Sequence, residues 1–169
     1  PHDPYDPPAK YRKWLRGQAL YSDGDRRLHA QSGGFPGQWQ KRQGLFSEAD
    51  RQNLIALYDG EIAFTDAQLG KMFTFLQKNG LWEKTVVVLV SDHGEWLGEE
   101  EMWDHCITLH EQEVRVPLIF RVPGLKKKPD AAGQAFSTLD IFPTLTELLA
   151  LSDPDSAQRE GFAIFKAPS

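Results

Sequence analysis

The sequence predicts an α/β domain in which a central, mostly parallel sheet is flanked by helices. Three segments indicate this fold class: a helical pattern over residues 47–79, an all-apolar run at 86–90 and a second apolar run at 116–122. Helices that alternate with buried strands are typical of α/β folds. With 169 residues, the chain is long enough to bury a hydrophobic core.

The first 46 residues are predicted to form an irregular segment. PHDPYDPPA, at residues 1–9, contains four prolines, and proline lacks the backbone N–H that a helix interior requires. Gly33-Gly34 and Phe35-Pro36-Gly37 interrupt the polar stretch that follows. We expect at most one short helix here, near residues 10–15.

The helix predicted next begins at Ser47 and ends just before Gly80. Its apolar residues recur mostly at spacings of three, four and seven, as one helical face requires. The first residues, Ser47-Glu48-Ala49-Asp50, resemble a capping box. A helix of this length could bend at Gly60 or Gly70.

Two strands and a second helix are predicted beyond Gly80. Val86–Val90 are apolar without alternation, which indicates burial on both faces and favours a central, parallel strand. VPLIFRV, at residues 116–122, predicts another strand, closed by Pro123-Gly124. Residues 137–151 predict a helix with Pro143 in its first turn.

The chain is interpreted as one partial domain: residues 1–46 are irregular, 47–151 form the α/β core and 152–169 form a sparse polar tail. Its net charge of -5 argues against general nucleic-acid affinity, and Lys126-Lys127-Lys128 is read as a solvated turn. No stretch reaches the roughly 20 apolar residues of a membrane span. Because the sequence opens at Pro1 within a loop, we expect it to be part of a longer protein.

The polar residues after the first strand raise the question of function. In TVVVLVSDHGEWLGEE, Asp92 and His93 follow the carboxyl end of the strand, which is where α/β sheets bind ligands. Gly94 permits a sharp turn and a close backbone approach to a ligand. An aspartate oxygen suits calcium or magnesium, and a histidine nitrogen suits zinc. By itself the pair fits either a metal site or an ordinary polar turn capped by Asp92.

Five segments, in order, resemble sulfatases of the alkaline phosphatase superfamily: PHDPY, YDGEIAFTDAQLG, the strand into SDHGE, RVPLIFRVPG and STLDIFPTLTELL. The resemblance covers nearly the whole chain. It implies an alkaline-phosphatase-like fold, hydrolysis of sulfate esters in small molecules or glycans, and a divalent cation, usually calcium. The chain corresponds to the later part of a sulfatase catalytic domain.

The resemblance also implies roles for single residues. Asp92 and His93 match the two metal ligands of the SDHG motif, although many members have asparagine or glutamine at the second position. His2 matches a histidine of the proline-rich loop that lies close to the sulfate ester, and His105 matches a residue that contacts the sulfate group. His110 is a weaker match, because relatives commonly have tyrosine there.

The chemistry of the reaction agrees with these roles. Breaking a sulfate ester requires stabilisation of negative charge on the sulfuryl oxygens and on the departing oxygen. A divalent cation can supply part of that charge, and an imidazole can donate a proton to the leaving group. The alternatives are a flexible terminal residue for His2 and a surface histidine for His105.

Several sulfatase features have no counterpart in this sequence. The family oxidises a cysteine to formylglycine within Cys-x-Pro/Ala-x-Arg, but Cys106 is followed by Ile-Thr-Leu-His, so we expect formylglycine upstream of this chain. The paired aspartates that supply further metal ligands are also missing. At Glu100, relatives often have histidine in a loop that borders the substrate. We therefore expect the isolated chain to bind calcium weakly and to be inactive.

Three other functions remain open. A phosphoric or phosphonic ester hydrolase of the same superfamily shares SDHG-like motifs and differs chiefly in its nucleophile. A binding module could keep the fold without the chemistry. A plain α/β domain without a site would have to match five ordered motifs by chance.

Overall fold

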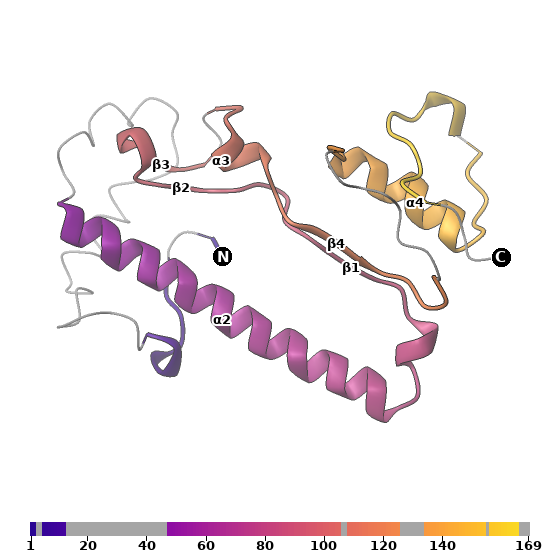
Figure 1. Ribbon diagram of the computed structural model, residues 1–169, viewed down its shortest axis with the longest axis horizontal. Helices are drawn as coiled ribbons and strands as arrows, with labels where there is room; N and C mark the ends of the chain where they lie inside the picture. Colours follow the sequence, from indigo (N-terminus) through magenta and orange to yellow (C-terminus); the bar gives the residue numbers. More distant parts are fainter. Residues whose placement is uncertain (3–4, 13–46, 106–107, 126–133, 155, 166–169) are drawn as a thin grey trace. The chain divides into compact units, whose positions relative to one another are not determined.

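The computed structural model of the protein describes residues 1–2, 5–12, 47–105, 108–125, 134–154 and 156–165. They form two compact units (Figure 1). The first comprises the described parts of Pro1–Asn79 and His93–Pro117, and the second those of Gly80–Asp92 and Leu118–Ser169. Most of residues 10–46, together with Lys126–Lys128 and Cys106, lie outside the described residues, so predictions for them stay predictions.

The long helix α2 (Glu48–Lys78) dominates the first unit. It begins directly after Ser47 and ends two residues before Gly80, as predicted. The helix continues through Gly60, where a Cβ atom would lie only 2.7 Å from the carbonyl oxygen of Tyr11. The glycine therefore makes room for the N-terminal segment. The predicted capping box depends on the side chain of Asp50, which is outside the described part.

The N-terminal segment lies along α2. The Asp6 amide donates to the Glu61 carboxylate at 2.7 Å, and the Tyr5 ring meets the Tyr58 ring edge-on with centroids 5.4 Å apart. The short 3-10 helix η1 (Ala9–Tyr11) follows. These contacts hold the proline-rich segment, and His2 with it, on the first unit.

Two short strands and a short helix complete the first unit. Strand β2 (Trp96–Leu97) pairs antiparallel with β3 (Trp103–Asp104), and a 3-10 turn, η4 (Glu99–Glu101), connects them. Helix α3 (Glu111–Val114) comes next. The buried apolar side chains of the unit are Tyr5, Leu57, Trp96 and Trp103.

The second unit opens with a 3-10 turn, η3 (Trp82–Lys84), followed by β1 (Val87–Val90). This strand pairs antiparallel with β4 (Leu118–Arg121), and Val87 lies opposite Arg121. The positions of both predicted strands are confirmed, but the expected parallel pairing is wrong for the strands that the structure describes. The expected burial on both faces is not observed either, since no residue of β1 is buried and Val90 is 41% exposed. An uninterrupted apolar run does not specify the direction of the neighbouring strand.

Helix α4 (Ile141–Leu148) follows a 3-10 turn, η5 (Thr138–Asp140), and Pro143 lies in its first turn as predicted. The Asp140 side chain accepts hydrogen bonds from the Ser137 amide at 2.8 Å and the Phe162 amide at 2.9 Å. The predicted sparse tail therefore packs against α4, after a last 3-10 turn, η6 (Ser156–Gln158).

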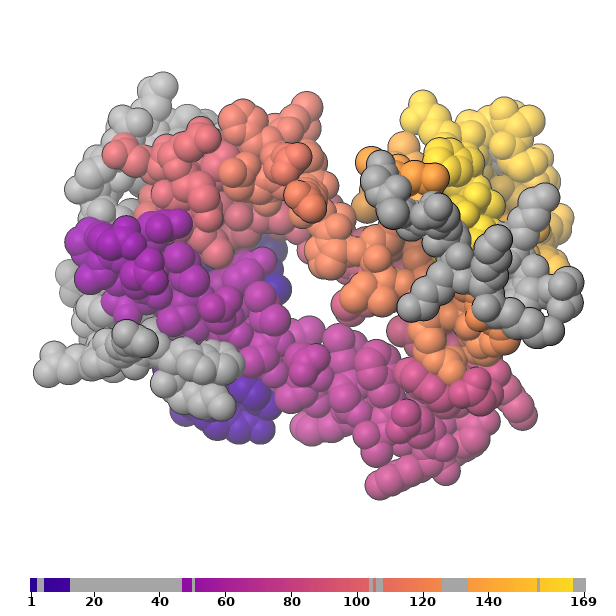
Figure 2. Space-filling view, viewed as in Figure 1, coloured from indigo at the N-terminus to yellow at the C-terminus, as the bar shows by residue number. Residues whose placement is uncertain are grey.

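Several large apolar side chains among the described residues are exposed to solvent. Phe75 on α2 is 59% exposed, and Ile119 on β4 is 57% exposed. In Figure 2, α2 presents a long open surface on the face in view. Among the described helices, none combines the length and the apolar character that crossing a membrane requires.

Candidate active site

The segment His93–Glu95 is fixed by a backbone contact with α3. The Gly94 amide donates to the Glu113 carbonyl at 2.7 Å, and a Cβ atom on residue 94 would lie 2.0 Å from the Gln112 carbonyl oxygen. Only glycine permits this approach. We expected Gly94 to admit a ligand, whereas the neighbour that the structure places against it is the protein backbone.

Three histidines from distant parts of the sequence meet in the first unit. The candidate ligand atoms of His2, His93 and His105 all lie within 4.8 Å of one another. The His93 and His105 rings stack with centroids 4.2 Å apart and an interplanar angle of 21°. The His2 ring meets the His105 ring edge-on at 4.7 Å. Three of the four predicted site residues are thus brought together.

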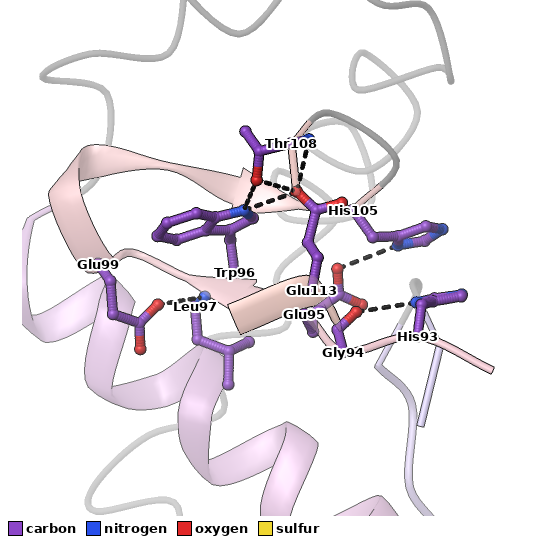
Figure 3. Close-up of polar contacts among 9 residues, drawn as sticks. All are labelled: His93, Gly94, Glu95, Trp96, Leu97, Glu99, His105, Thr108 and Glu113. Atoms are coloured by element: carbon purple, nitrogen blue, oxygen red, sulfur yellow. Dashed lines mark hydrogen bonds and ion pairs between the residues drawn. The ribbon is translucent and has the colours of Figure 1, made fainter. Parts of the chain in front are cut away.

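Oxygen atoms orient two of these rings (Figure 3). His93 Nδ1 lies 2.8 Å from the Gly94 carbonyl oxygen, and His105 Nδ1 lies 3.0 Å from a carboxylate oxygen of Glu95. A carbonyl or an ionised carboxylate can only accept, so each Nδ1 carries the proton and donates it. In the neutral ring, the Nε2 atom then carries the lone pair that can bind a metal ion.

The pair formed by Glu95 and His105 is largely removed from solvent. The side chain of Glu95 is 3% exposed and that of His105 is 13% exposed. Sequence reasoning did not select Glu95, although its position two residues after His93 in an extended segment was a usable signal. Its partner could not be identified from spacing, because His105 lies ten residues further along the chain.

A second carboxylate, Glu113, organises the loop beside these histidines. Its Oε1 atom accepts from Trp96 Nε1 at 2.7 Å, from the Thr108 amide at 3.0 Å and from Thr108 Oγ1 at 2.8 Å (Figure 3). Glu113 is 5% exposed. Three donors on one oxygen hold α3, β2 and the segment at Thr108 together, and no sequence motif indicated this role.

The cluster found among the described residues does not include the other candidate residues. Asp92 is exposed and is the last residue of the segment Gly80–Asp92, which belongs to the second unit. His110 precedes α3, and its ring lies 5.5 Å from the Trp96 ring. Glu100 is exposed in η4 with a positive φ of 51°.

The three clustered histidines do not fit calcium. Calcium takes six to eight oxygen ligands, whereas this cluster offers three imidazole nitrogens. Nitrogen ligands suit zinc and other transition metals.

A family model and several curated relatives identify the same protein family. The family model described as Sulfatase matches residues 1–151, which confirms the resemblance inferred from the five motifs. Arylsulfatase K of Mus musculus is 34% identical over 111 residues, covering 66% of this chain and 20% of the relative. An arylsulfatase of Clostridium perfringens is 29% identical and covers 94% of this chain and 34% of the relative.

Solved structures confirm the α/β, alkaline-phosphatase-like fold class. The phosphonate monoester hydrolase of Agrobacterium radiobacter superposes with a TM-score of 0.61 at 26% identity, over 90% of this chain and 33% of the hydrolase. The chain spans about a fifth of the length of the arylsulfatase K relatives that it matches.

Proposed function

This chain belongs to the sulfatase family, and from that premise we propose that the protein hydrolyses sulfate esters. The observation that carries the proposal is the meeting of His2, His93 and His105, because the histidines of PHDPY and SDHGE and a third that matches a sulfate-contacting residue lie together. We propose a sulfated small molecule or a sulfated glycan as the substrate. When protonated, the imidazoles offer Nε2–H donors to a tetrahedral oxyanion.

We assign separate tasks to His2 and His105. Both imidazoles would contact the sulfate group and stabilise the negative charge that develops on its oxygens. His105 is supported by Glu95, whose carboxylate 3.0 Å from Nδ1 would stabilise an imidazolium that holds or donates a proton. His2 lies at the exposed side of the cluster, where a substrate could reach it.

Asp92 and His93 remain the predicted ligands of a divalent cation. Such a cation would supply positive charge next to the sulfuryl oxygens. The nucleophile is proposed to be a formylglycine located upstream of this chain, since Cys106 lacks the sequence context that formylglycine formation needs.

The test is a hydrolysis assay on the full-length protein with aryl sulfate, aryl phosphate and aryl phosphonate substrates. His105→Ala should lower kcat/KM for the aryl sulfate by about 100-fold or more, as loss of a proton donor does. His110→Ala is the matched control and should retain activity, because His110 is not one of the three clustered histidines. Equal activity of wild type and His105→Ala would refute the role of His105.

A phosphonic or phosphoric ester hydrolase is the second candidate. The likeness to the Agrobacterium radiobacter phosphonate monoester hydrolase favours it, because this likeness extends over nine-tenths of the chain. The same assay separates the two: a kcat/KM higher for the aryl phosphonate or phosphate than for the aryl sulfate would replace the leading proposal.

A further inference from the structure

We propose that Gly60 of α2 is a positioning residue for His2. The absence of a side chain at residue 60 leaves a notch in the surface of the helix, and the N-terminal segment, defined here as residues 5–12, docks in this notch. The docking holds His2 at the histidine cluster. The inference rests on the proposed function, in which His2 contacts the sulfate group, and Gly60 itself is not a member of the cluster.

The needs of the helix do not explain Gly60. The residue is buried and lies in the interior of the 31-residue α2. Apart from proline, glycine is the poorest helix former, and alanine is the best. Gly70 of the same helix offers a comparison, because a Cβ atom there would meet nothing within 4 Å. Of these two glycines, only Gly60 lies where a side chain would collide with another segment.

The atoms that fill the notch cannot readily move aside. A Cβ atom on residue 60 would lie 2.7 Å from the Tyr11 carbonyl oxygen, and 2.9 Å and 3.2 Å from two ring atoms of Pro7. The first of these atoms belongs to the backbone, and the other two belong to a proline ring that is fully buried. Arg12 stiffens the segment by donating from Nε to the Pro7 carbonyl at 2.7 Å. A methyl group at residue 60 would therefore displace the segment as a whole.

Contacts on both sides of Gly60 fix the N-terminal segment on α2 (Figure 1). They join the Asp6 amide to the Glu61 carboxylate at 2.7 Å, the Tyr5 ring to the Tyr58 ring with centroids 5.4 Å apart, and the Tyr11 ring to the Phe64 ring with centroids 5.5 Å apart. The partners on α2 all lie between residues 58 and 64, so a displacement at residue 60 loosens each of these contacts.

The chain connects the docked segment to the site. His2 precedes Tyr5 by three residues, and three extended residues span about 10 Å at most. Tyr5 is only 4% exposed, so its docked position limits how far His2 can move from the His105 ring, which lies 4.7 Å from the His2 ring. A displacement of Tyr5 is passed on to His2, which is exposed to solvent and can follow it.

The test compares Gly60→Ala with Gly70→Ala in the full-length protein. It measures hydrogen–deuterium exchange of the amides of residues 5–12 and, separately, kcat/KM for an aryl sulfate. Gly60→Ala should speed the exchange and lower kcat/KM by about tenfold or more, because a misplacement of about 1 Å can cause such a loss. Gly70→Ala should change neither quantity. Circular dichroism should show undiminished helix content in both variants, since alanine favours the helix.

A double-mutant cycle with His2→Ala shows whether Gly60 acts through His2. In that case, adding Gly60→Ala to His2→Ala should cause no further loss of kcat/KM. Losses that multiply, or unchanged exchange of residues 5–12 in Gly60→Ala, would overturn the proposal. Failure of the proposed function has a different result, since His2→Ala alone would then hydrolyse the aryl sulfate as well as the wild type does. The exchange measurement would still decide whether Gly60 holds the segment.

A second variant tests the docking without adding an atom to the helix. Glu61→Ala removes the acceptor of the Asp6 amide and should speed the exchange of residues 5–12 by about threefold, as loss of one hydrogen bond does. It should lower kcat/KM by a smaller factor than Gly60→Ala. Faster exchange with unchanged kcat/KM in both variants would show that the docked segment does not position His2, and would overturn the proposal.

Discussion

The two units bury different kinds of side chains. In the first, Tyr5, Leu57, Trp96 and Trp103 are buried and form an apolar core. Among the described residues of the second, the most buried side chains are polar, namely Asp140 and Thr144. The strands of the second unit keep apolar residues open to solvent, with Ile119 57% exposed.

Each unit nevertheless contains a buried carboxylate that joins several segments, Glu113 in the first and Asp140 in the second, and the two work differently. Glu113 collects three donors on a single oxygen, Oε1. Asp140 uses both oxygens: Oδ2 accepts from the Ser137 amide and Oδ1 from the Phe162 amide. The Thr144 hydroxyl extends the second arrangement by donating to the Asp140 carbonyl and accepting from the Ile164 amide.

Glu113 therefore helps to position the histidine cluster, whereas Asp140 only joins segments of the chain. The backbone of Glu113 also holds Gly94, next to His93, so the network of Glu113 continues into the histidine cluster. Asp140 joins the start of α4 to the C-terminal segment within the second unit. Substitutions at either residue should therefore lower stability, but only those at Glu113 should affect the histidine site.

The largest expected effect is that of Glu113→Ala. It removes the acceptor shared by Trp96 Nε1, the Thr108 amide and the Thr108 hydroxyl, and leaves Trp96 Nε1 only its longer contact with Thr108 Oγ1 at 3.3 Å. We therefore expect the free energy of unfolding of the first unit to fall by about 3 kcal/mol. Urea unfolding followed by tryptophan fluorescence measures this loss. Glu111→Ala, on the same helix but exposed, should change stability by less than about 1 kcal/mol.

The isosteric variant sharpens the test. Glu113→Gln keeps one oxygen that can accept from all three donors, so its loss should be much smaller than that of the alanine variant. Equal losses for the two variants would show that the negative charge, and not the acceptor position, holds the network.

The next effect is that of Asp140→Asn. An asparagine turns one of the two accepting oxygens into an NH₂ group that faces a backbone N–H, and we expect a loss of about 1.5 kcal/mol in thermal or urea unfolding of the second unit. Glu147→Gln, exposed on α4, is the control and should be neutral. Aryl sulfate hydrolysis by the full-length protein should be unchanged in Asp140→Asn. Loss of activity would mean that the carboxylates do not differ in the way proposed.

Local patterns were enough to predict most of the secondary structure. Apolar spacing identified α2, and uninterrupted apolar runs identified β1 and β4. The direction of strand pairing was not predictable, because a run of apolar side chains leaves the direction of the partner strand unspecified. The packing of the tail was missed since it depends on backbone amides of Phe162 and Ile164, and amides carry no sequence signature.

The candidate site was predicted only in part, because some of its contacts form only when distant segments meet in the folded chain. Motifs that resemble sulfatases pointed to His2, His93 and His105, and the structure brings these three together. Glu95 and Glu113 were not selected, because their roles depend on partners that reach them only in the folded chain. Contacts between distant segments arise from tertiary structure, which a linear pattern does not encode.

The smallest expected effect is a pH dependence of the stability of the first unit that comes from Tyr58. Burial raises the pKa of the Tyr58 phenol above its ordinary value, and the nearby carboxylates of Glu95, Asp59 and Glu61 raise it further. The folded state therefore holds this proton more tightly than the unfolded chain, and the resulting stability is complete below the unfolded pKa and is lost as pH rises through the folded value.

Tyr58→Phe tests this linkage at the first unit. Above about pH 10, the ordinary pKa of tyrosine, the wild type should lose more stability in urea than the variant, because phenylalanine has no proton to lose. The comparison is made as a difference between the two proteins, so lysines and other tyrosines common to both cancel. A variant that loses as much stability as the wild type would place Tyr58 in a solvated environment, contrary to its contact with Tyr5 beside the buried Glu95.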